Sequence, residues 1–279
     1  MGDWPLHGSM VQMAFISQDP TAVTFGKNLV TGAANTKNAS WLELIASTPF
    51  HAHSLIVLPG PDDPTDYLID IAIGAAGSEV IIINNLTHSH GNTLYYGQNV
   101  VSMFQIPVNI PAGTRISVKA QGYAATKTIS FSAYILNNNN FKGIYPTGKI
   151  ITYGANTADS GGVSIDPGGT VKTKGAWSEI TSSCEALQGL VMAFGNQRNA
   201  NRAWAGWIID LGIGAAGSEQ VLIPDWGLMG NQTTSALTPT YSPYLPISIP
   251  AGTRLSMRAA CYINDATDRL IDGFIYGVA

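Results

Sequence analysis

The most regular feature of the sequence is an alternation of apolar and polar side chains with a period of two residues. Between residues 67 and 73 every second position carries Tyr or Ile, and residues 207–213 repeat this pattern with Trp207 in place of Tyr67. The same alternation runs through residues 116–120. A period of two is typical of half-buried strands. No segment combines a helical period with helix caps, so we expect an all-β protein.

Several motifs occur twice and in the same order. DIAIGAAGSE at residues 70–79 recurs as DLGIGAAGSE at 210–219, and IPAGTR at 110–115 recurs at 249–254. The two offsets, 140 and 139 residues, are nearly equal, so the segment between the motifs kept its length. Upstream, a Trp-x-Glu motif and a Thr-aromatic-Gly motif recur as well. The pattern therefore predicts an internal duplication.

Each copy is expected to form about six to eight short strands separated by turns that contain Gly and Pro. This arrangement is typical of an antiparallel β-sandwich, and we predict two tandem jelly-roll-like modules. We assign residues 1–29 to an N-terminal arm or attachment segment, 30–136 to module 1 and 171–279 to module 2. Residues 137–170, which contain an Asn run and Gly-Gly pairs, are predicted to be a linker.

The composition narrows the classes of function. Only 11% of the residues are charged, the net charge is −4 and the basic residues do not cluster, which excludes a nucleic-acid footprint. No apolar run is long enough to span a membrane. The first residues lack the basic and apolar regions of a signal peptide, so we expect synthesis in the cytoplasm without secretion. An uncharged polar surface is typical of extracellular sandwiches and viral structural proteins, where neighbouring subunits cover part of it.

The repeated turn motifs indicate structure rather than chemistry. GAAGSE lacks the Lys-Ser/Thr ending of a phosphate loop and leads into a strand, so its glycines are predicted to form a turn. Asp70 and Asp210 interrupt apolar strands and are conceivable acid/base groups, but no second carboxylate lies nearby in sequence. Four charged residues at matching places in the two copies are predicted to anchor turns by ion pairs or carboxylate–backbone bonds. They are Glu79, Arg115, Glu219 and Arg254.

Histidines and cysteines are distributed unevenly between the copies. Four of the five histidines form two His-x-His pairs in module 1: His51, His53, His88 and His90. On a strand such a pair lies on one face, about 7 Å apart, which suits a metal ion. Module 2 has no counterpart, so solvated or subunit-contact histidines are the favoured interpretation, and no cofactor is indicated. Cys184 and Cys261 are expected to be buried thiols, with a disulfide as the alternative.

The segments between the shared motifs differ most between the copies. They combine aromatic residues with Asn, Gln, Asp and Thr, which suits sugars because flat rings pack on C–H faces and polar groups bond hydroxyls. The alternative interpretation, packing against a neighbouring subunit, stays open. The glycan-binding candidates are Trp226, Asp225, Asn231, Tyr241, Tyr244, Tyr95, Tyr96 and Trp204.

The pairing of Asp-Ile-x-Ile-Gly-Ala-Ala-Gly-Ser-Glu with a later Ile-Pro-Ala-Gly-Thr-Arg resembles virion proteins of tailed bacteriophages. It is also similar to the head-spike and fibre components of gene transfer agents. The resemblance covers both modules but neither the arm nor the linker. It implies a virion structural protein, often homo-oligomeric, that contacts other virion proteins and adsorbs to capsule or lipopolysaccharide.

Three hypotheses follow from the sequence. The first is a non-enzymatic receptor-binding spike or fibre protein whose arm attaches it to the particle. The second is a purely structural decoration, collar or baseplate protein. The third, a glycan-degrading enzyme, needs two carboxylates that converge in a cleft.

Overall fold

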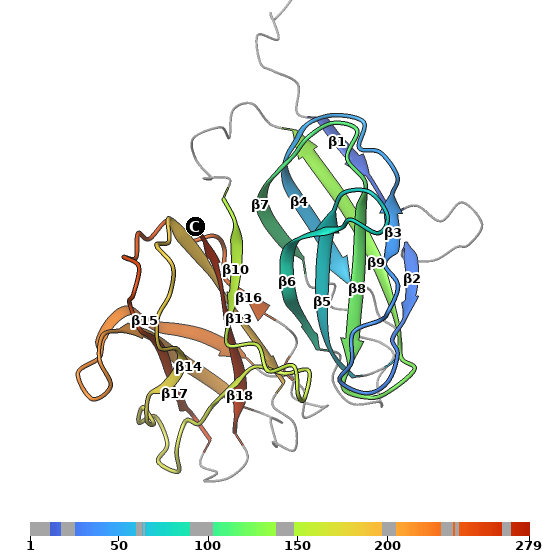
Figure 1. Cartoon of the computed structure of the whole chain (residues 1–279). Coiled ribbons are helices and arrows are strands. Elements are labelled where there is room, and N and C mark those ends of the chain that lie inside the picture. The colour runs from blue at the N-terminus through green and yellow to red at the C-terminus, as the bar shows by residue number, and fades with distance from the viewer. Residues whose placement is uncertain are drawn as a thin grey trace, which may run out of the picture.

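The computed structural model describes residues 12–17, 26–59, 63, 65–89, 103–137, 148–196, 205–229, 237, 240–263 and 269–279. Within these ranges every regular element is a strand, and the strands form two sandwiches that lie side by side (Figure 1). This confirms the all-β prediction. Among the same residues, no helix has the length and apolar character needed to cross a lipid bilayer.

Module 1 consists of two antiparallel sheets that face each other. One sheet has the order β1-β9-β4-β7, with β2 also paired to β9, and the other has the order β3-β8-β5-β6. The strands are β1 (Gln12–Phe15), β2 (Lys27–Val30), β3 (Leu42–Ile45), β4 (Ala52–Pro59), β5 (Asp66–Ile73), β6 (Val80–Ser89), β7 (Phe104–Ile110), β8 (Ile116–Gly122) and β9 (Thr128–Asn137).

Module 2 repeats this arrangement strand for strand. Its sheets have the orders β10-β18-β13-β16, with β11 also paired to β18, and β12-β17-β14-β15. The strands are β10 (Ile150–Tyr153), β11 (Val163–Ile165), β12 (Ser178–Thr181), β13 (Gly189–Asn196), β14 (Gly206–Ile213), β15 (Gln220–Met229), β16 (Thr240–Tyr241), β17 (Leu255–Cys261) and β18 (Ile271–Val278). In both modules most consecutive strands lie in opposite sheets, apart from β1–β2, the β5–β6 hairpin and their counterparts in module 2. The first strand pairs with the last, and the resulting order is that of a jelly roll. The prediction of two tandem jelly rolls is confirmed.

The module boundaries differ from those expected from the sequence. β1 and most of β2 fall in the segment assigned to an arm, and β10 and β11 fall in the segment assigned to a linker. All four strands pair with the last strand of their own module and are therefore parts of the sandwiches. They have only three or four residues each, too few for an alternating pattern to stand out beside the surrounding Gly and Asn residues.

The alternating residues fill the space between the sheets, as expected. Trp207 is 2% exposed, and its indole N–H donates to the carbonyl of Arg269. Tyr67 occupies the same place in module 1, with its hydroxyl 2.8 Å from the carbonyl oxygens of Asp63 and Thr128. Both large aromatic residues thus bury their rings and satisfy their polar atoms.

Both cysteines are buried free thiols, in agreement with the favoured interpretation. Cys184 and Cys261 belong to the apolar core of module 2. Burial raises the pKa of the Cys184 thiol and outweighs its backbone hydrogen bonds.

The Thr-aromatic-Gly motif ends on a glycine that the fold requires. Gly26 and Gly154 have φ values of 118° and 86°, which side-chain-bearing residues rarely adopt. A Cβ atom at Gly26 would lie 1.8 Å from the carbonyl oxygen of Phe131 on β9. The glycine is therefore repeated because the chain passes close to the backbone of the last strand, β9 or β18, at this point of each module.

We predict that Gly26→Ala lowers the free energy of unfolding by at least about 3 kcal/mol, because the new methyl group collides with backbone and the φ angle is unfavourable. Gly32→Ala is the matched control, since a Cβ atom there meets nothing within 4 Å. We expect it to change stability by less than about 1 kcal/mol in urea unfolding. Equal stability of the two variants would contradict the assigned role of Gly26.

Candidate functional site

A buried carboxylate lies at the same place in both modules. Asp70 on β5 and Asp210 on β14 each face a bulge in the neighbouring strand. The bulge residue is Asn85 or Asp225, with left-handed φ values of 53° and 51°. Its backbone N–H donates to the carboxylate, at 2.8 Å in module 1 and 2.9 Å in module 2. Asn and Asp tolerate this backbone conformation better than most residues, which explains the residue types found there.

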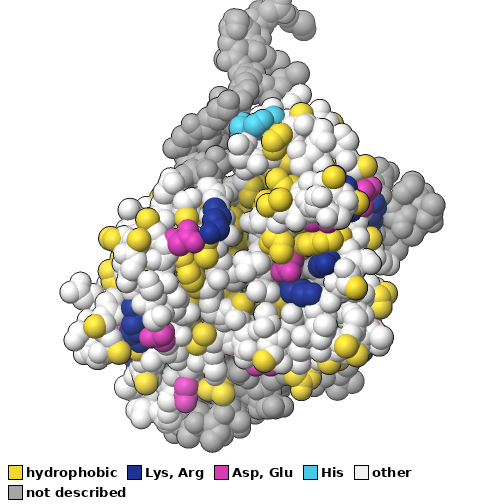
Figure 2. Space-filling view, viewed as in Figure 1, with side chains coloured by type: hydrophobic (Ala, Val, Ile, Leu, Met, Phe, Trp, Pro, Cys, Tyr) yellow, Lys and Arg dark blue, Asp and Glu magenta, His cyan; other side chains and the backbone are white. Residues whose placement is uncertain are grey.

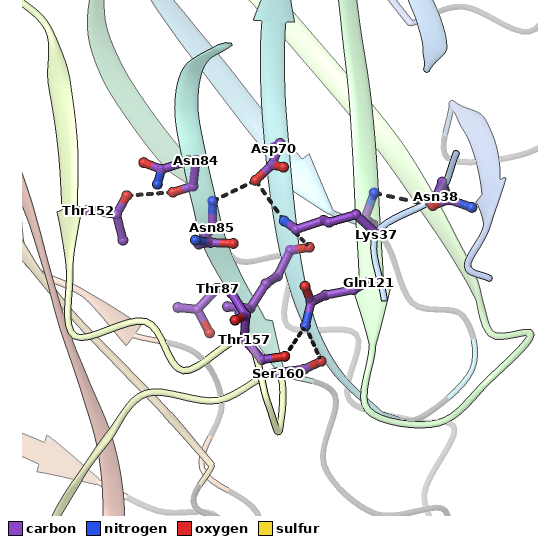
Figure 3. Close-up of polar contacts among 12 residues, drawn as sticks. Lys37, Asn38, Asp70, Asn84, Asn85, Thr87, Gln121, Thr152, Thr157 and Ser160 are labelled. Carbon is purple, nitrogen blue, oxygen red and sulfur yellow. Dashed lines mark hydrogen bonds and ion pairs between the residues drawn. The ribbon is translucent and has the colours of Figure 1, made fainter. Parts of the chain in front are cut away.

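A lysine pairs with each of these carboxylates. Lys37 Nζ lies 2.6 Å from Asp70, and Lys174 Nζ lies 2.6 Å from Asp210 (Figure 3 shows the first pair). Arg258 adds a second ion pair to Asp210 at 2.9 Å. Burial alone would raise the pKa of the Asp210 carboxyl, but the bulge N–H and the two cations hold it below its ordinary value. These contacts give Asp70 and Asp210 a structural role at the bulge.

The repeated arginine clamps the glycine-rich turn. Arg115 lies 2.9 Å from Glu79, which also accepts the backbone N–H of Gly77, and 2.8 Å from Glu43. Module 2 has the same clamp, in which Arg254 lies 2.9 Å from Glu219 and 2.6 Å from Glu179. The Trp-x-Glu motif thus supplies the second carboxylate of each clamp. Charged groups form small clusters of this kind on a mostly uncharged surface (Figure 2).

The two modules share an interface at the edge strand β6. The hydroxyl of Tyr276 on β18 accepts the backbone N–H of Thr87 at 2.7 Å and lies 3.2 Å from the carbonyl oxygen of Asn85. Tyr241 on β16 donates to the carbonyl oxygen of Thr87. Thr152 on β10 donates to the carbonyl oxygen of Asn84 at 2.5 Å (Figure 3). Hydroxyl groups of module 2 therefore bind backbone groups at the edge of the module 1 sheet, where another strand could otherwise pair.

Apolar and amide contacts extend this interface. The ring of Phe104 on β7 lies 4.8 Å from that of Tyr241 and 5.0 Å from that of Tyr276. The side-chain amide of Gln121 on β8 donates to the Thr157 carbonyl and the Ser160 hydroxyl, both at 2.9 Å. Burial raises the pKa of both interface tyrosines, so their hydroxyls stay protonated.

The structure separates the predicted glycan-binding residues. Tyr241 lies in the interface between the modules, which corrects its assignment to a ligand site, because its hydroxyl and ring are already engaged. Tyr244 lies against Gly189 and donates to the Gln188 carbonyl at 3.2 Å. Trp226 packs against the module 2 core, because it faces inward beside Ile209.

Asp225 is exposed and forms an ion pair with Lys174 at 3.0 Å, in addition to its role in the bulge. The remaining glycan-binding candidates lie outside the described residues. They are Tyr95, Tyr96, Trp204 and Asn231.

The histidine pairs do not form one site. The rings of His51 and His53 lie 4.7 Å apart near the surface, and His51 Nε2 lies 2.5 Å from Asn109 Oδ1. His88 is buried and stacks on Tyr67 at 6.0 Å, which corrects its interpretation as a solvated residue. His90 lies outside the described residues. Within the described ranges, no three His, Cys, Asp or Glu residues gather as metal ligands would.

An exposed tyrosine that is not among the predicted site residues lies at the same end of both modules. Tyr123 follows β8 and is 38% exposed, and Tyr262 follows β17 and is 45% exposed. Their backbone N–H groups bond to matching carbonyls, those of Asp66 and Gly206. At Gly206 a Cβ atom would lie 2.8 Å from the Tyr262 ring and 2.9 Å from the sulfur of Met229, so both side chains lie over this glycine. The shared Tyr at an offset of 139 residues was the available signal.

No family model and no curated protein matches the chain. Solved structures similar to it include the following three. PNGF-II is 9% identical, with a TM-score of 0.38, and the match covers 95% of this chain but only 65% of PNGF-II. PNGase F, a glycosylasparaginase from Flavobacterium meningosepticum, is 10% identical with a TM-score of 0.34, covering 97% and 96% of the two chains. The N-terminal CBM22-1-CBM22-2 tandem domain of Paenibacillus barcinonensis Xyn10C is 11% identical with a TM-score of 0.24, covering 98% and 95%. The strand order of each module defines the jelly roll.

We predict that Asp210→Asn lowers the free energy of unfolding by about 2 kcal/mol, because it breaks two partly buried ion pairs. Asp70→Asn, which breaks the single pair with Lys37, is expected to cost less. Because the folded pKa of Asp210 lies below its ordinary 3.8, its contribution is present above that pH and is lost as the pH falls through the lower folded value. Urea unfolding at several pH values measures both effects. An Asn variant that keeps the full acid dependence of the wild type would contradict this role.

We predict that Tyr276→Phe destabilises the protein by about 2 kcal/mol, because the N–H of Thr87 loses its partner inside the interface. Tyr244→Phe removes a hydroxyl that donates a long, solvent-exposed bond to the Gln188 carbonyl, and it is expected to cost less than about 0.5 kcal/mol. Thermal and urea unfolding of the two variants test the difference. Equal effects would show that the hydroxyl bonds of β6 do not stabilise the pair of modules.

Proposed function

We propose that the protein is a non-enzymatic virion surface protein of the spike or fibre type that binds host cell-surface polysaccharide. The observation that carries the glycan part of this proposal is the exposed tyrosine, Tyr123 or Tyr262, at the same end of both modules. The fold does not bury these rings, although it repeats their backbone contacts. A repeated exposed ring supports a binding role.

The surroundings of Tyr262 suit a sugar. Met229 is 70% exposed and Ile208 is 40% exposed, and Met229 shares the surface over Gly206 with the Tyr262 ring. These side chains offer apolar contact for the C–H face of a pyranose ring. Trp204 precedes Gly206 by two residues along the chain, and Asn231 follows Met229 by two residues. An aromatic and an amide side chain are therefore close to this surface in sequence.

The virion part of the proposal rests on the resemblance of the two repeated motifs to phage and gene transfer agent proteins. Under it, the protein is carried on the particle surface, and the N-terminal segment binds other virion proteins. The small fraction of charged residues in the chain supports a surface that is partly covered by neighbouring virion subunits. The purely structural virion role is the second candidate, and it is favoured by the exposed apolar side chains of Met13 and Phe15 on β1.

Binding of purified capsule and lipopolysaccharide to wild type, Tyr123→Ala, Tyr262→Ala and the double variant tests this proposal. We expect each single variant to weaken binding about tenfold, and the double variant to lose it, because two sites on one chain reinforce each other. Val80→Ala, which alters a 63% exposed side chain at the other end of the module 1 strands, is the control and leaves binding unchanged. If the double variant binds as the wild type does, the glycan site does not include Tyr123 or Tyr262. Absence of binding to any host polysaccharide would favour the structural role, and release of reducing ends would indicate an enzyme.

A further inference from the structure

The interface between the modules uses one side of module 1 and a different side of module 2. Module 1 contributes the edge strand β6, and module 2 contributes the outer face of the sheet β10-β18-β13. Because the modules are copies, each of these two surfaces has an equivalent surface on the other module that lies outside this interface. These counterparts are the outer face of β1-β9-β4 in module 1 and the β15 edge in module 2.

Strand register identifies matching residues on the first counterpart. Tyr276 pairs with Thr152 and Val191 on its two neighbouring strands. Tyr134 on β9 pairs with Phe15 and Ile56 in the same way. Tyr134 therefore occupies in module 1 the place of the tyrosine that binds the β6 edge in module 2.

This face of module 1 is apolar and exposed. Met13 is 56% exposed, Phe15 is 39% exposed, and the Phe15 ring lies 5.0 Å from that of Tyr134. The outward positions of β1, β9 and β4 carry no charged side chain in the described part of these strands. They are Met13, Phe15, Thr128, Ser130, Ser132, Tyr134, Leu136, Ser54, Ile56 and Leu58. A charge-free sheet face of this kind marks a contact surface.

The second counterpart, the β15 edge of module 2, is equivalent by strand register to the part of β6 that the interface covers. Thr87 pairs with Leu68 in module 1, and Gly227 pairs with Ile208 in module 2. Thr87 is 3% exposed and Leu68 is fully buried, whereas Gly227 is exposed and Ile208 is 40% exposed. A Cβ atom at Gly227 would meet nothing within 4 Å, so the space above it is open.

We propose that the outer face of β1-β9-β4 binds the β15 edge of a second copy of this chain, repeating between chains the contact that joins the two modules. The Tyr134 hydroxyl then binds the backbone N–H of Gly227 and the carbonyl of Asp225 in the second copy, as Tyr276 binds Thr87 and Asn85 within one chain. This contact is heterologous, so it closes into a ring or continues as an open chain of copies.

The contact between copies covers Ile208 but leaves the Tyr262 ring of the proposed glycan site accessible. Tyr123, the counterpart of Tyr262, remains 38% exposed although module 2 is docked beside it. Docking of a second copy in the same way leaves Tyr262 accessible. Loss of glycan binding by Tyr262→Ala with unchanged self-association would therefore separate the two proposals.

Sedimentation velocity of the full chain at increasing concentration tests the contact. We expect wild type to self-associate and Tyr134→Phe, which removes only the hydroxyl, to associate about five- to tenfold more weakly. Phe15→Arg and Gly227→Arg each place a charge in one half of the contact, and each is expected to be monomeric. The fold tolerates the second change because the space at Gly227 is open. Val80→Arg is the control and associates as wild type does.

Mixing the two arginine variants distinguishes this contact from a symmetric one. Each variant keeps one intact half, so an equimolar mixture forms a heterodimer and no larger species. A monomeric wild type at all concentrations overturns the proposal. It is also overturned if Gly227→Arg self-associates like wild type, or if the mixture stays monomeric. If circular dichroism shows that an arginine variant does not fold, the Tyr134→Phe variant tests the proposal instead. Self-association of Tyr134→Phe equal to that of the wild type then overturns the assigned hydrogen bonds.

Discussion

The bond between the Asp70 carboxylate and the N–H of Asn85 is the contact on which the arrangement of the two modules depends. It holds a bulge in β6, and a bulge redirects the backbone groups next to it. Those groups, from Asn84 to Thr87, are the ones that bind hydroxyls of module 2. A buried carboxylate without a partner would lower the stability of the fold by several kcal/mol, so the ion pair with Lys37 is part of the same structural feature. The ion pair between Lys37 and Asp70 thus supports the bulge whose neighbouring backbone groups receive module 2.

Module 2 has the same carboxylate-stabilised bulge, but the residues around the bulge differ from those in module 1. Asp210 has two cationic partners where Asp70 has Lys37, and the bulge residue is itself a carboxylate. Pro224 stands beside it at the place of Asn84 and has no N–H to offer a neighbouring strand, which is a common way to protect an edge. The β15 edge therefore resists pairing with another strand while its carbonyls and the N–H of Gly227 remain accessible to side-chain hydroxyls.

The sequence was sufficient for the fold because period-two alternation and repeated turn motifs both survive duplication. It was insufficient for the short strands β1, β2, β10 and β11, whose three or four residues depend on pairing with a distant last strand. The bulge was also missed. Lys37 and Lys174 stand at an offset of 137 residues, between repeated motifs, and Asn85 and Asp225 stand at an offset of 140, yet nothing local shows that they meet Asp70 and Asp210. Only the folded sheet brings these residues together.

The site residues were harder to predict for a related reason. An aromatic residue in a polar segment has the same composition whether it binds a sugar or another module, and Tyr241 proved to do the latter. What distinguishes the two outcomes is comparison between the copies after folding. Tyr276 and Tyr134 are equivalent by register, but module 1 covers only the first, whereas Tyr123 and Tyr262 remain exposed in both modules. A residue covered in one copy and exposed in the other indicates a contact made by docking. Tyr123 and Tyr262, exposed in both modules despite a docked neighbour, form the surface that we propose for the ligand.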